Sequence, residues 1–232
     1  MLYLSELKKS KMRILIVAAT IKEIEPLIAE FGKGEASTAS VIQLQTANCQ
    51  VLITGVGMVA TAFALGMHLS ANRYDLVVNL GIAGSLDRSI SLGEVLEVTE
   101  DTFAELGAED DTEFLSIENM GFGVSKYHPT TKLIDLYNLF NNFNLRVATA
   151  ITVNTVHGND ASIQKIASRL NPQLESMEGA AFFYACRQLN VPCLQIRAVS
   201  NYVEKRNRGN WKIGLAIKNL NTFAVMFLQL YA

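Results

Sequence analysis

The sequence is poor in cysteine, in proline and in charge. Its 232 residues include three cysteines and four prolines, and only 18% are Asp, Glu, Lys or Arg. Three cysteines give no complete disulfide set, and Cys49, Cys186 and Cys193 lack the spacing of metal ligands. We interpret them as buried thiols of a protein in a reducing cytoplasm, in preference to a nucleophilic cysteine.

Neither sign of charge dominates. The chain has 20 Lys and Arg against 22 Asp and Glu, with no long basic block, so we expect no nucleic-acid partner. Half of the residues are hydrophobic, which excludes an intrinsically disordered chain. The most apolar stretches, Val56–Leu69 and Phe223–Ala232, are short or broken by polar residues, so we expect no membrane span.

The first residues, Met1–Lys11, are mixed and charged and lack the apolar run of a signal peptide. We interpret residues 1–11 as an N-terminal extension. No Pro-, Gly- or Ser-rich linker follows, so residues 12–232 are expected to form one domain, and the default location is the cytoplasm.

Hydrophobic runs of strand length alternate with helical stretches along this domain. The expected strands are Arg13–Ala19, Val51–Thr54, Leu76–Leu80, Val95–Thr99, Arg146–Thr152 and Pro192–Ser200. The expected helices are Ile24–Phe31, Val59–Ala71, Met177–Leu189 and Trp211–Leu230. Continuous apolar strands between helices predict a single three-layer α/β domain, with a mainly parallel, twisted central sheet flanked by helices.

One segment departs from this alternation. Asp101–Gly123 is acidic, contains several glycines and has little periodicity. It is either a solvated excursion or a loop over a ligand site, because long loops in α/β proteins often carry function. The sequence leaves both interpretations open.

Polar residues and glycines gather where the expected strands end, which is where open α/β sheets bind ligands. They are Glu23, Gly55-Val56-Gly57, Gly81-Ile82-Ala83-Gly84, Asn154–Asp160 and Asn201. Glu178 opens the helix before the last strand. Two carboxylates, two glycine turns and an amide at strand ends form a set typical of an enzyme.

The first glycine turn also allows a different interpretation. Gly55-Val56-Gly57-Met58-Val59-Ala60 fits the loose dinucleotide-binding pattern G-x-G-x-x-A. That pattern requires an acidic residue at the end of the next strand, where this chain has Asn79-Leu80-Gly81. A nicotinamide enzyme is therefore disfavoured, and the glycines either permit tight turns or bring bare amides close to a ligand.

Five blocks of sequence resemble the purine nucleoside phosphorylase/nucleosidase superfamily, in the order in which that family has them. They are Met12–Ala19 with Glu23, Thr54–Gly57, Asn79–Gly84 with Gly93–Val95, Ser176–Ala181, and Arg197–Asn201. Within the superfamily the chain is most similar to the methylthioadenosine/S-adenosylhomocysteine nucleosidases and, closer still, to the futalosine hydrolases. The run Ser200–Arg208 favours the latter.

This resemblance implies a nucleoside phosphorylase-like fold and a metal-free, cofactor-free hydrolase. The expected reaction is the attack of water on the N-glycosidic bond of futalosine, which releases hypoxanthine and dehypoxanthine futalosine in menaquinone biosynthesis. It also implies a homodimer or a higher homo-oligomer. The alternatives are a methylthioadenosine/S-adenosylhomocysteine nucleosidase, a purine nucleoside phosphorylase, or a non-catalytic purine-nucleoside sensor.

The two glutamates take roles that suit this chemistry. Breaking an N-glycosidic bond builds positive charge on the ribose, which a carboxylate stabilises. By resemblance, Glu178 binds the ribose hydroxyls and faces the cationic sugar, and Glu23 positions and deprotonates the water. Without the resemblance, Glu178 would be interpreted as a charge at the start of a helix and Glu23 as a solvated helix carboxylate. A phosphorylase usually has an arginine near the first turn to bind phosphate, and Ala18–Glu23 contains no arginine.

Asn201 stands where adenosine-type nucleosidases place an aspartate. An asparagine amide donates to a 6-oxo group, so this residue predicts a 6-oxopurine base. It is also compatible with a simple Asx turn. Because an amide is no general acid, protonation of the leaving purine has no assigned agent.

Further residues complete the expected site. The substrate-binding candidates are Gly55, Gly57, Gly81, Ala83, Gly84 and Met177, with Phe103 or Tyr202 against the base and Arg206 or Arg208 on the benzoate of futalosine. Arg197 is expected to be a buried structural cation near Glu178. His157 is interpreted as a loop histidine in preference to a catalytic one.

Overall fold

The structure, a computed structural model, describes residues 12–131 and 145–232; the expected extension, residues 1–11, lies outside them. The strands are β1 (Ile14–Ala18), β2 (Val41–Gln43), β3 (Cys49–Ile53), β4 (Leu76–Ser85), β5 (Val95–Phe103), β6 (Gly107–Asp110), β7 (Glu113–Ser116), β8 (Lys126–Tyr127), β9 (Arg146–Thr152), β10 (Leu174–Ser176) and β11 (Cys193–Tyr202). The helices are α2 (Ile21–Phe31), α3 (Met58–Ala71), α5 (Asp160–Leu170), α6 (Gly179–Gln188) and α7 (Ile213–Tyr231), with a short 3-10 turn at Arg208–Asn210.

Nine strands form one sheet in the order β10-β9-β5-β11-β4-β1-β3-β2, with β8 attached to β5. Strand β1 pairs parallel with β3 and β4, β4 pairs parallel with β11, and β9 pairs parallel with β5 and β10. The contacts of β11 with β5 and of β2 with β3 are antiparallel. The predicted single α/β domain with a mainly parallel sheet is confirmed.

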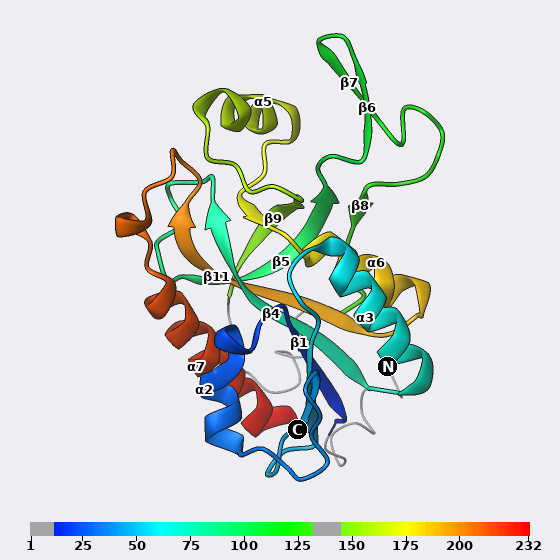
Figure 1. The fold of residues 1–232 in the computed structure, drawn as a ribbon, viewed down its shortest axis with the longest axis vertical. Coiled ribbons are helices and arrows are strands. Elements are labelled where there is room, and N and C mark those ends of the chain that lie inside the picture. The colour runs from blue at the N-terminus through cyan, green and yellow to red at the C-terminus, as the bar shows by residue number, and fades with distance from the viewer. Residues whose placement is uncertain (1–11, 132–144) are drawn as a thin grey trace.

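Both faces of the sheet are buried, and alternating side chains of β1 point to opposite faces. Ile14, Ile16 and Ala18 of β1 belong to a cluster with α2 and α7, whereas Leu15 and Val17 belong to a cluster with α3 and α6. This alternation follows from the two-residue period of a strand. Figure 1 shows the two helix pairs on opposite sides of the sheet, which gives the predicted three layers.

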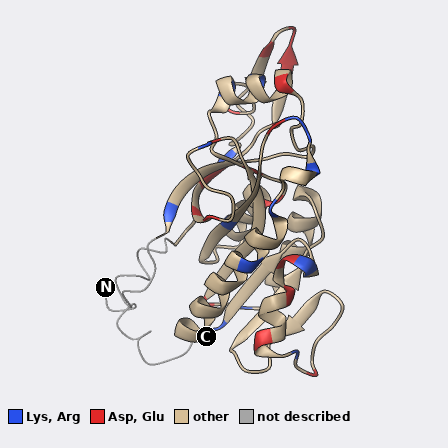
Figure 2. Ribbon diagram, turned by 90° about the vertical axis from the view of Figure 1, so that its left-hand side faces the viewer, with Lys and Arg blue, Asp and Glu red and all other residues tan. Residues whose placement is uncertain are grey.

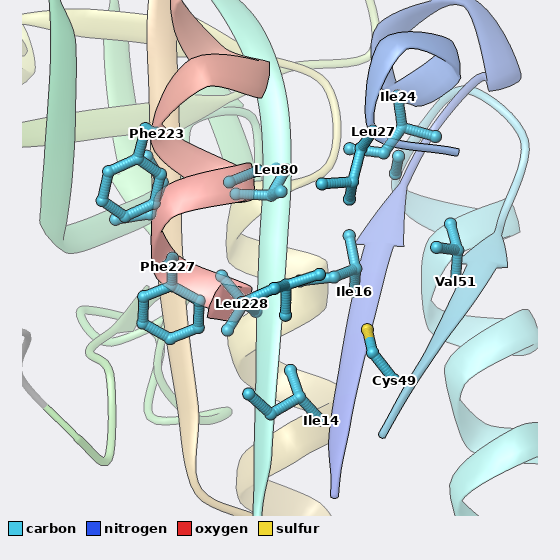
Figure 3. Close-up of a cluster of buried hydrophobic side chains, with 14 of the residues drawn as sticks. Ile14, Ile16, Ile24, Leu27, Cys49, Val51, Leu80, Phe223, Phe227 and Leu228 are labelled. Atoms are coloured by element: carbon cyan, nitrogen blue, oxygen red, sulfur yellow. The ribbon is translucent and has the colours of Figure 1, made fainter. Parts of the chain in front are cut away.

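Helix α7 is the one helix of the described residues that is long and apolar enough, by length and composition, to cross a membrane. The sequence analysis found no such stretch. Core helices of folded proteins pass the same test. Phe223, Phe227 and Leu228 of this helix belong to the same buried cluster as Leu80 and Ile14 of the sheet (Figure 3), and we attribute its apolarity to this packing.

Strands β4 and β11 are longer than predicted, and this corrects the placement of several site residues. Strand β4 continues through Gly81–Gly84 to Ser85, and β11 continues to Tyr202, so the second glycine block and Asn201 lie inside strands. A Cβ atom on Gly81 would lie 2.1 Å from Nη1 of Arg197, so this glycine makes room for the buried guanidinium and does not form a turn.

The acidic segment Asp101–Gly123 divides between the sheet and a projection. Its first residues extend β5, and β6 and β7 then form a separate two-stranded sheet that projects from the body. Acidic positions mark this projecting hairpin in Figure 2. These two strands and β2, β8 and β10 were not predicted, because such short strands carry little hydrophobic period. Helix α5 was also not predicted.

Strand β10 determines where a site can form. It pairs parallel with β9 and antiparallel with β4, so β4, β11, β5, β9 and β10 close into a ring. The expected binding site was placed by the rule for open sheets, and closure of the ring was not predicted. In the closed ring Glu175 pairs with Gly84, and on the other side of β4 Asn201 pairs with the same Gly84.

A buried carboxyl inside this ring makes stability depend on pH. Asp101 is fully buried, and burial raises its pKa to about 6, although Gln195 and Thr152 each donate a hydrogen bond of 2.8 Å. An unfolded aspartate titrates near pH 3.9. Between about pH 4 and pH 6 the folded state keeps a proton on Asp101 that the unfolded state has lost. The raised pKa of Asp101 therefore contributes its full stabilisation of the fold below about pH 4, and this contribution falls as the pH rises and is lost by about pH 6.

We predict that Asp101→Asn removes this pH dependence, because an amide mimics the protonated carboxyl at every pH. Urea unfolding midpoints at pH 4, 5, 6 and 7 measure it. Asp110→Asn on the exposed hairpin is the matched control and keeps the wild-type pH profile. An unchanged profile in Asp101→Asn contradicts the assignment.

Candidate active site

A cavity of about 440 Å³ opens beside the pairing of β10 with β4, which closes the ring. Its walls come from the start of α2, the end of β4, the loop after β9, the β10–α6 junction, the end of β11 and the start of α7. The polar lining includes Thr20, Lys22, Glu23, His157, Glu175, Ser176, Glu178, Ser200, Asn201, Tyr202, Glu204 and Arg206. Segments distant in sequence therefore meet at one place, as the predicted strand-end site requires.

Glu23 is held at the first turn of α2. Its Oε2 accepts hydrogen bonds from the backbone N–H (3.0 Å) and the hydroxyl (2.9 Å) of Thr20, the residue before the helix. Its Oε1 accepts the backbone N–H of Ile82 in β4 at 3.2 Å. Since a carboxylate offers about four acceptor positions, these three bonds fix the group and leave one position toward the cavity.

Glu178 is the residue that precedes the first turn of α6, and its side chain is 7% exposed. Its Oε1 accepts the backbone N–H of Gly57 at 3.0 Å. Gly57 has a φ of 98°, which favours glycine, and this conformation turns its amide toward the carboxylate. The positive end of the α6 dipole favours a negative charge at this position.

Arg197 is buried beneath the cavity floor at 2% exposure, as predicted for a structural cation. It donates a hydrogen bond to Oδ1 of Asn79 and passes beside Gly81, where a Cβ atom would also lie 3.2 Å from Oε1 of Glu23. Its side-chain hydrogen bond thus goes to Asn79 in β4, and not to Glu178. A cation in this place balances the buried carboxylates around it.

Asn201 lies at an irregularity in the pairing of β11 with β4. Its Oδ1 accepts from the hydroxyl of Ser200 at 2.8 Å, and its Nδ2 donates to the carbonyl of Tyr202 at 2.9 Å. Each amide nitrogen carries two hydrogens, so one donor of Asn201 remains for the cavity that it lines.

A histidine and a glutamate form a pair on the opposite wall. His157 Nδ1 hydrogen-bonds Oε2 of Glu175, and the backbone N–H of His157 donates to Oε1 of the same carboxylate at 2.9 Å. The side chain of Glu175 is 3% exposed and that of His157 is 15% exposed. The sequence analysis did not select Glu175 and disfavoured a catalytic role for His157.

A model of the phosphorylase superfamily matches residues 13–230. The chain belongs to this superfamily. It is 31% identical to the futalosine hydrolase of Thermus thermophilus over 73% of this chain and 76% of that protein. It is 34% identical to the futalosine hydrolase of Streptomyces coelicolor over 73% and 74% of the two chains.

A solved structure extends the likeness to the fold. The methylthioadenosine/S-adenosylhomocysteine nucleosidase of Colwellia psychrerythraea, in complex with adenine, superposes with a TM-score of 0.78 at 21% identity and covers 96% of both chains. This likeness covers nearly the whole of the fold described above.

The structure divides the other predicted residues of this superfamily member into two groups. Ala83, Gly84, Met177, Tyr202 and Arg206 line the cavity. The remaining candidates do not line it: Gly55, Gly57, Gly81, Phe103 and Arg208. Gly57 and Gly81 support the site from outside the lining. Gly57 donates its backbone N–H to Glu178, and Gly81 leaves space for the side chain of Arg197.

Several lining groups were missed. Trp211, Ile213 and Ile217 add an apolar side to the cavity, and Val56 adds another. The projecting hairpin contributes no residue to the lining of this cavity, so β6 and β7 are a solvated excursion, whereas Asp101 at the start of the acidic segment is buried in β5. Within residues 12–131 and 145–232, no three His, Cys, Asp or Glu side chains are arranged to hold a metal ion.

Proposed function

We propose that this protein hydrolyses the N-glycosidic bond of futalosine, releasing hypoxanthine and dehypoxanthine futalosine. The observation that carries the proposal is the pair of fixed carboxylates, Glu23 and Glu178, that face one nucleoside-sized cavity from two elements. The futalosine hydrolases among its relatives support this substrate.

The two carboxylates divide the work. As the bond to the purine breaks, positive charge grows on the ribose, and Glu178 stabilises it while accepting hydrogen bonds from the ribose hydroxyls. Glu23 uses its remaining acceptor position to orient a water molecule and take its proton. Backbone amides of Gly57 and Ile82 hold both groups, so little reorganisation is needed as the charge develops.

Asn201 selects the base. Its free amide hydrogen donates to the 6-oxo group of hypoxanthine. A 6-amino group is itself a donor, so it would face the Asn201 amide without forming a hydrogen bond. The expected substrates are therefore 6-oxopurine nucleosides. Hydrolysis is favoured over phosphorolysis because the first turn, Ala18–Glu23, offers a carboxylate and no arginine for a phosphate ion.

We predict that Glu23→Gln and Glu178→Gln each abolish hypoxanthine release and leave the fold intact, because an amide neither takes the water proton nor offsets a cationic sugar. Chromatographic product analysis with and without phosphate measures the reaction, and circular dichroism checks folding. Glu204→Gln, a carboxylate on the same wall paired with Arg88, is the control.

Full activity in either glutamine variant removes that glutamate from the mechanism. A sugar 1-phosphate product identifies a phosphorylase, and adenine release from methylthioadenosine contradicts the role given to Asn201. Tight binding of nucleosides without turnover identifies a sensor.

We further propose that Arg206 binds the benzoate of futalosine. Its guanidinium lies 5.2 Å from the centre of the Trp211 ring at the cavity wall, whereas Arg208 lies outside the lining. A hydrogen-bonded charge pair of this kind contributes about 1.5–3 kcal/mol, or roughly a tenfold change or more in binding.

Arg206→Ala is therefore predicted to raise KM for futalosine about tenfold or more and to leave the cleavage of inosine, which has no benzoate, unchanged. Steady-state kinetics on both nucleosides measure the split. Arg208→Ala is the matched control and behaves as wild type. Equal losses on both nucleosides in Arg206→Ala contradict the assignment.

We also propose that the chain is a homodimer through α3. Val59, Phe63 and Met67 are 79%, 71% and 63% exposed, and their spacing places them on one face of the helix. Exposed apolar patches of this kind mark interfaces. Val56, which is 56% exposed, continues the stripe into the cavity lining, so the partner would lie beside the site.

Light scattering during gel filtration tests this. The wild type is predicted to elute at twice its chain mass of 25.5 kDa. Phe63→Asp is predicted to elute at the monomer mass, because it places a charge where the proposed dimer interface would bury the phenyl ring. Met226→Asp, on the exposed side of α7, is the control and remains dimeric. A monomeric wild type at micromolar concentration contradicts the proposal.

The setting that we propose is menaquinone biosynthesis in a reducing cytoplasm. All three cysteine thiols are buried and free, as a cytoplasmic protein requires. Burial raises the pKa of the Cys49 thiol to about 12, which keeps it unreactive. A deletion strain that grows without added menaquinone contradicts this placement in metabolism.

A further inference from the structure

The mechanism above leaves one step without an agent, namely the transfer of a proton to the departing purine. Glu23 takes a proton from water, Glu178 faces the sugar, and Asn201 is an amide with no acidic proton. A purine anion is a poor leaving group in a partly apolar cavity, because the charge it carries away is poorly solvated there. A proton donor on the base side of the cavity would remove this cost.

His157 and Glu175 lie in that place. Strand β4 carries Gly84 between two neighbours, with Asn201 on β11 at one side and Glu175 on β10 at the other. Neighbouring strands lie about 4.8 Å apart, so a purine held by Asn201 over Gly84 lies one strand from Glu175 and its histidine. All four residues line the same cavity.

The contacts of this pair fix the imidazole. Glu175 is buried and accepts both the backbone N–H and the Nδ1 of His157, so its two oxygens hold the residue by main chain and side chain together. A carboxylate can only accept, so the hydrogen lies on Nδ1 and Nε2 is the free ring nitrogen. A carboxylate that orients an imidazole in this way also stabilises its cationic form during proton transfer.

We propose that His157 protonates the leaving purine, with Glu175 as its positioning residue; this rests on the proposed nucleoside hydrolysis. The bond between the ribose C1′ and the purine breaks, and its electron pair goes to the base. Nε2–H of the imidazolium gives its proton to the imidazole nitrogen of the purine. The oxygen of water bonds to C1′, its proton passes to Glu23, and exchange with solvent returns Glu23 and His157 to their starting states.

The test compares leaving groups that need a proton with leaving groups that do not. Futalosine methylated at purine N7 already carries a positive charge on the base, so its departure requires no acid. His157→Ala is predicted to lower kcat on futalosine about 100-fold or more, the usual contribution of a general acid, and to change kcat on the methylated nucleoside little. Glu175→Gln shows the same split, because glutamine holds the ring without stabilising the imidazolium.

His128→Ala is the matched control. This histidine is exposed, contacts the carbonyl of Thr99 and lies outside the cavity, so its loss leaves both substrates at wild-type rates. Free imidazole supplies a second measurement, since it enters the space left in His157→Ala. It is predicted to restore part of the rate on futalosine and to leave the control unchanged.

Equal losses on both substrates with no rescue by imidazole indicate that His157 only supports the wall, and overturn the proposal. Unchanged kinetics in His157→Ala also overturn it. Failure of the proposed function is distinct, because the wild type then releases no hypoxanthine from futalosine. In that case the same variants are compared on inosine and 7-methylinosine, or on the purine nucleoside that the wild type does cleave.

Discussion

The site depends on one constraint: carboxylates buried at the closed end of the ring must each be held by backbone amides. Glu23 accepts the N–H of Ile82, Glu178 that of Gly57, and Glu175 that of His157. Burying an ionised carboxylate without such donors would cost several kcal/mol. Strands and loops that supply these amides therefore fix the geometry of the cavity, and Arg197 beneath it balances the charge.

Ring closure by β10 makes this arrangement possible. This three-residue strand bonds to β9 and β4 at once, and it places Glu175 and Glu178 on either side of Ser176 and Met177 at the cavity wall. Helix α6 starts directly after it and turns its positive end toward Glu178. Large apolar clusters on both faces of the sheet hold the frame, so a few polar groups decide the chemistry.

Local patterns in the sequence predicted the frame well. Runs such as Ile14–Ala18 and Leu76–Leu80 are buried strands because nearly all of their residues are apolar. Glu23 was found because it follows the first of these strands, and Glu178 because it opens the helix before the last strand. Non-local features were not predictable. Strand β10 has three residues, too few to show a period. The approach of Arg197 to Gly81 joins two strands distant in sequence, and the contact of Glu175 with His157 joins β10 to the loop after β9, so neither shows in a local pattern.

The central claim is that one nucleoside lies with its ribose at Glu178 and Glu23 and its base at Asn201. The crystal structure of Glu178→Gln soaked with futalosine tests it most directly. The account predicts the ribose hydroxyls against residue 178, a water between Glu23 and C1′, and the 6-oxo group facing Asn201 over Gly84. A nucleoside bound in another cavity, or with its ribose away from both glutamates, would contradict it.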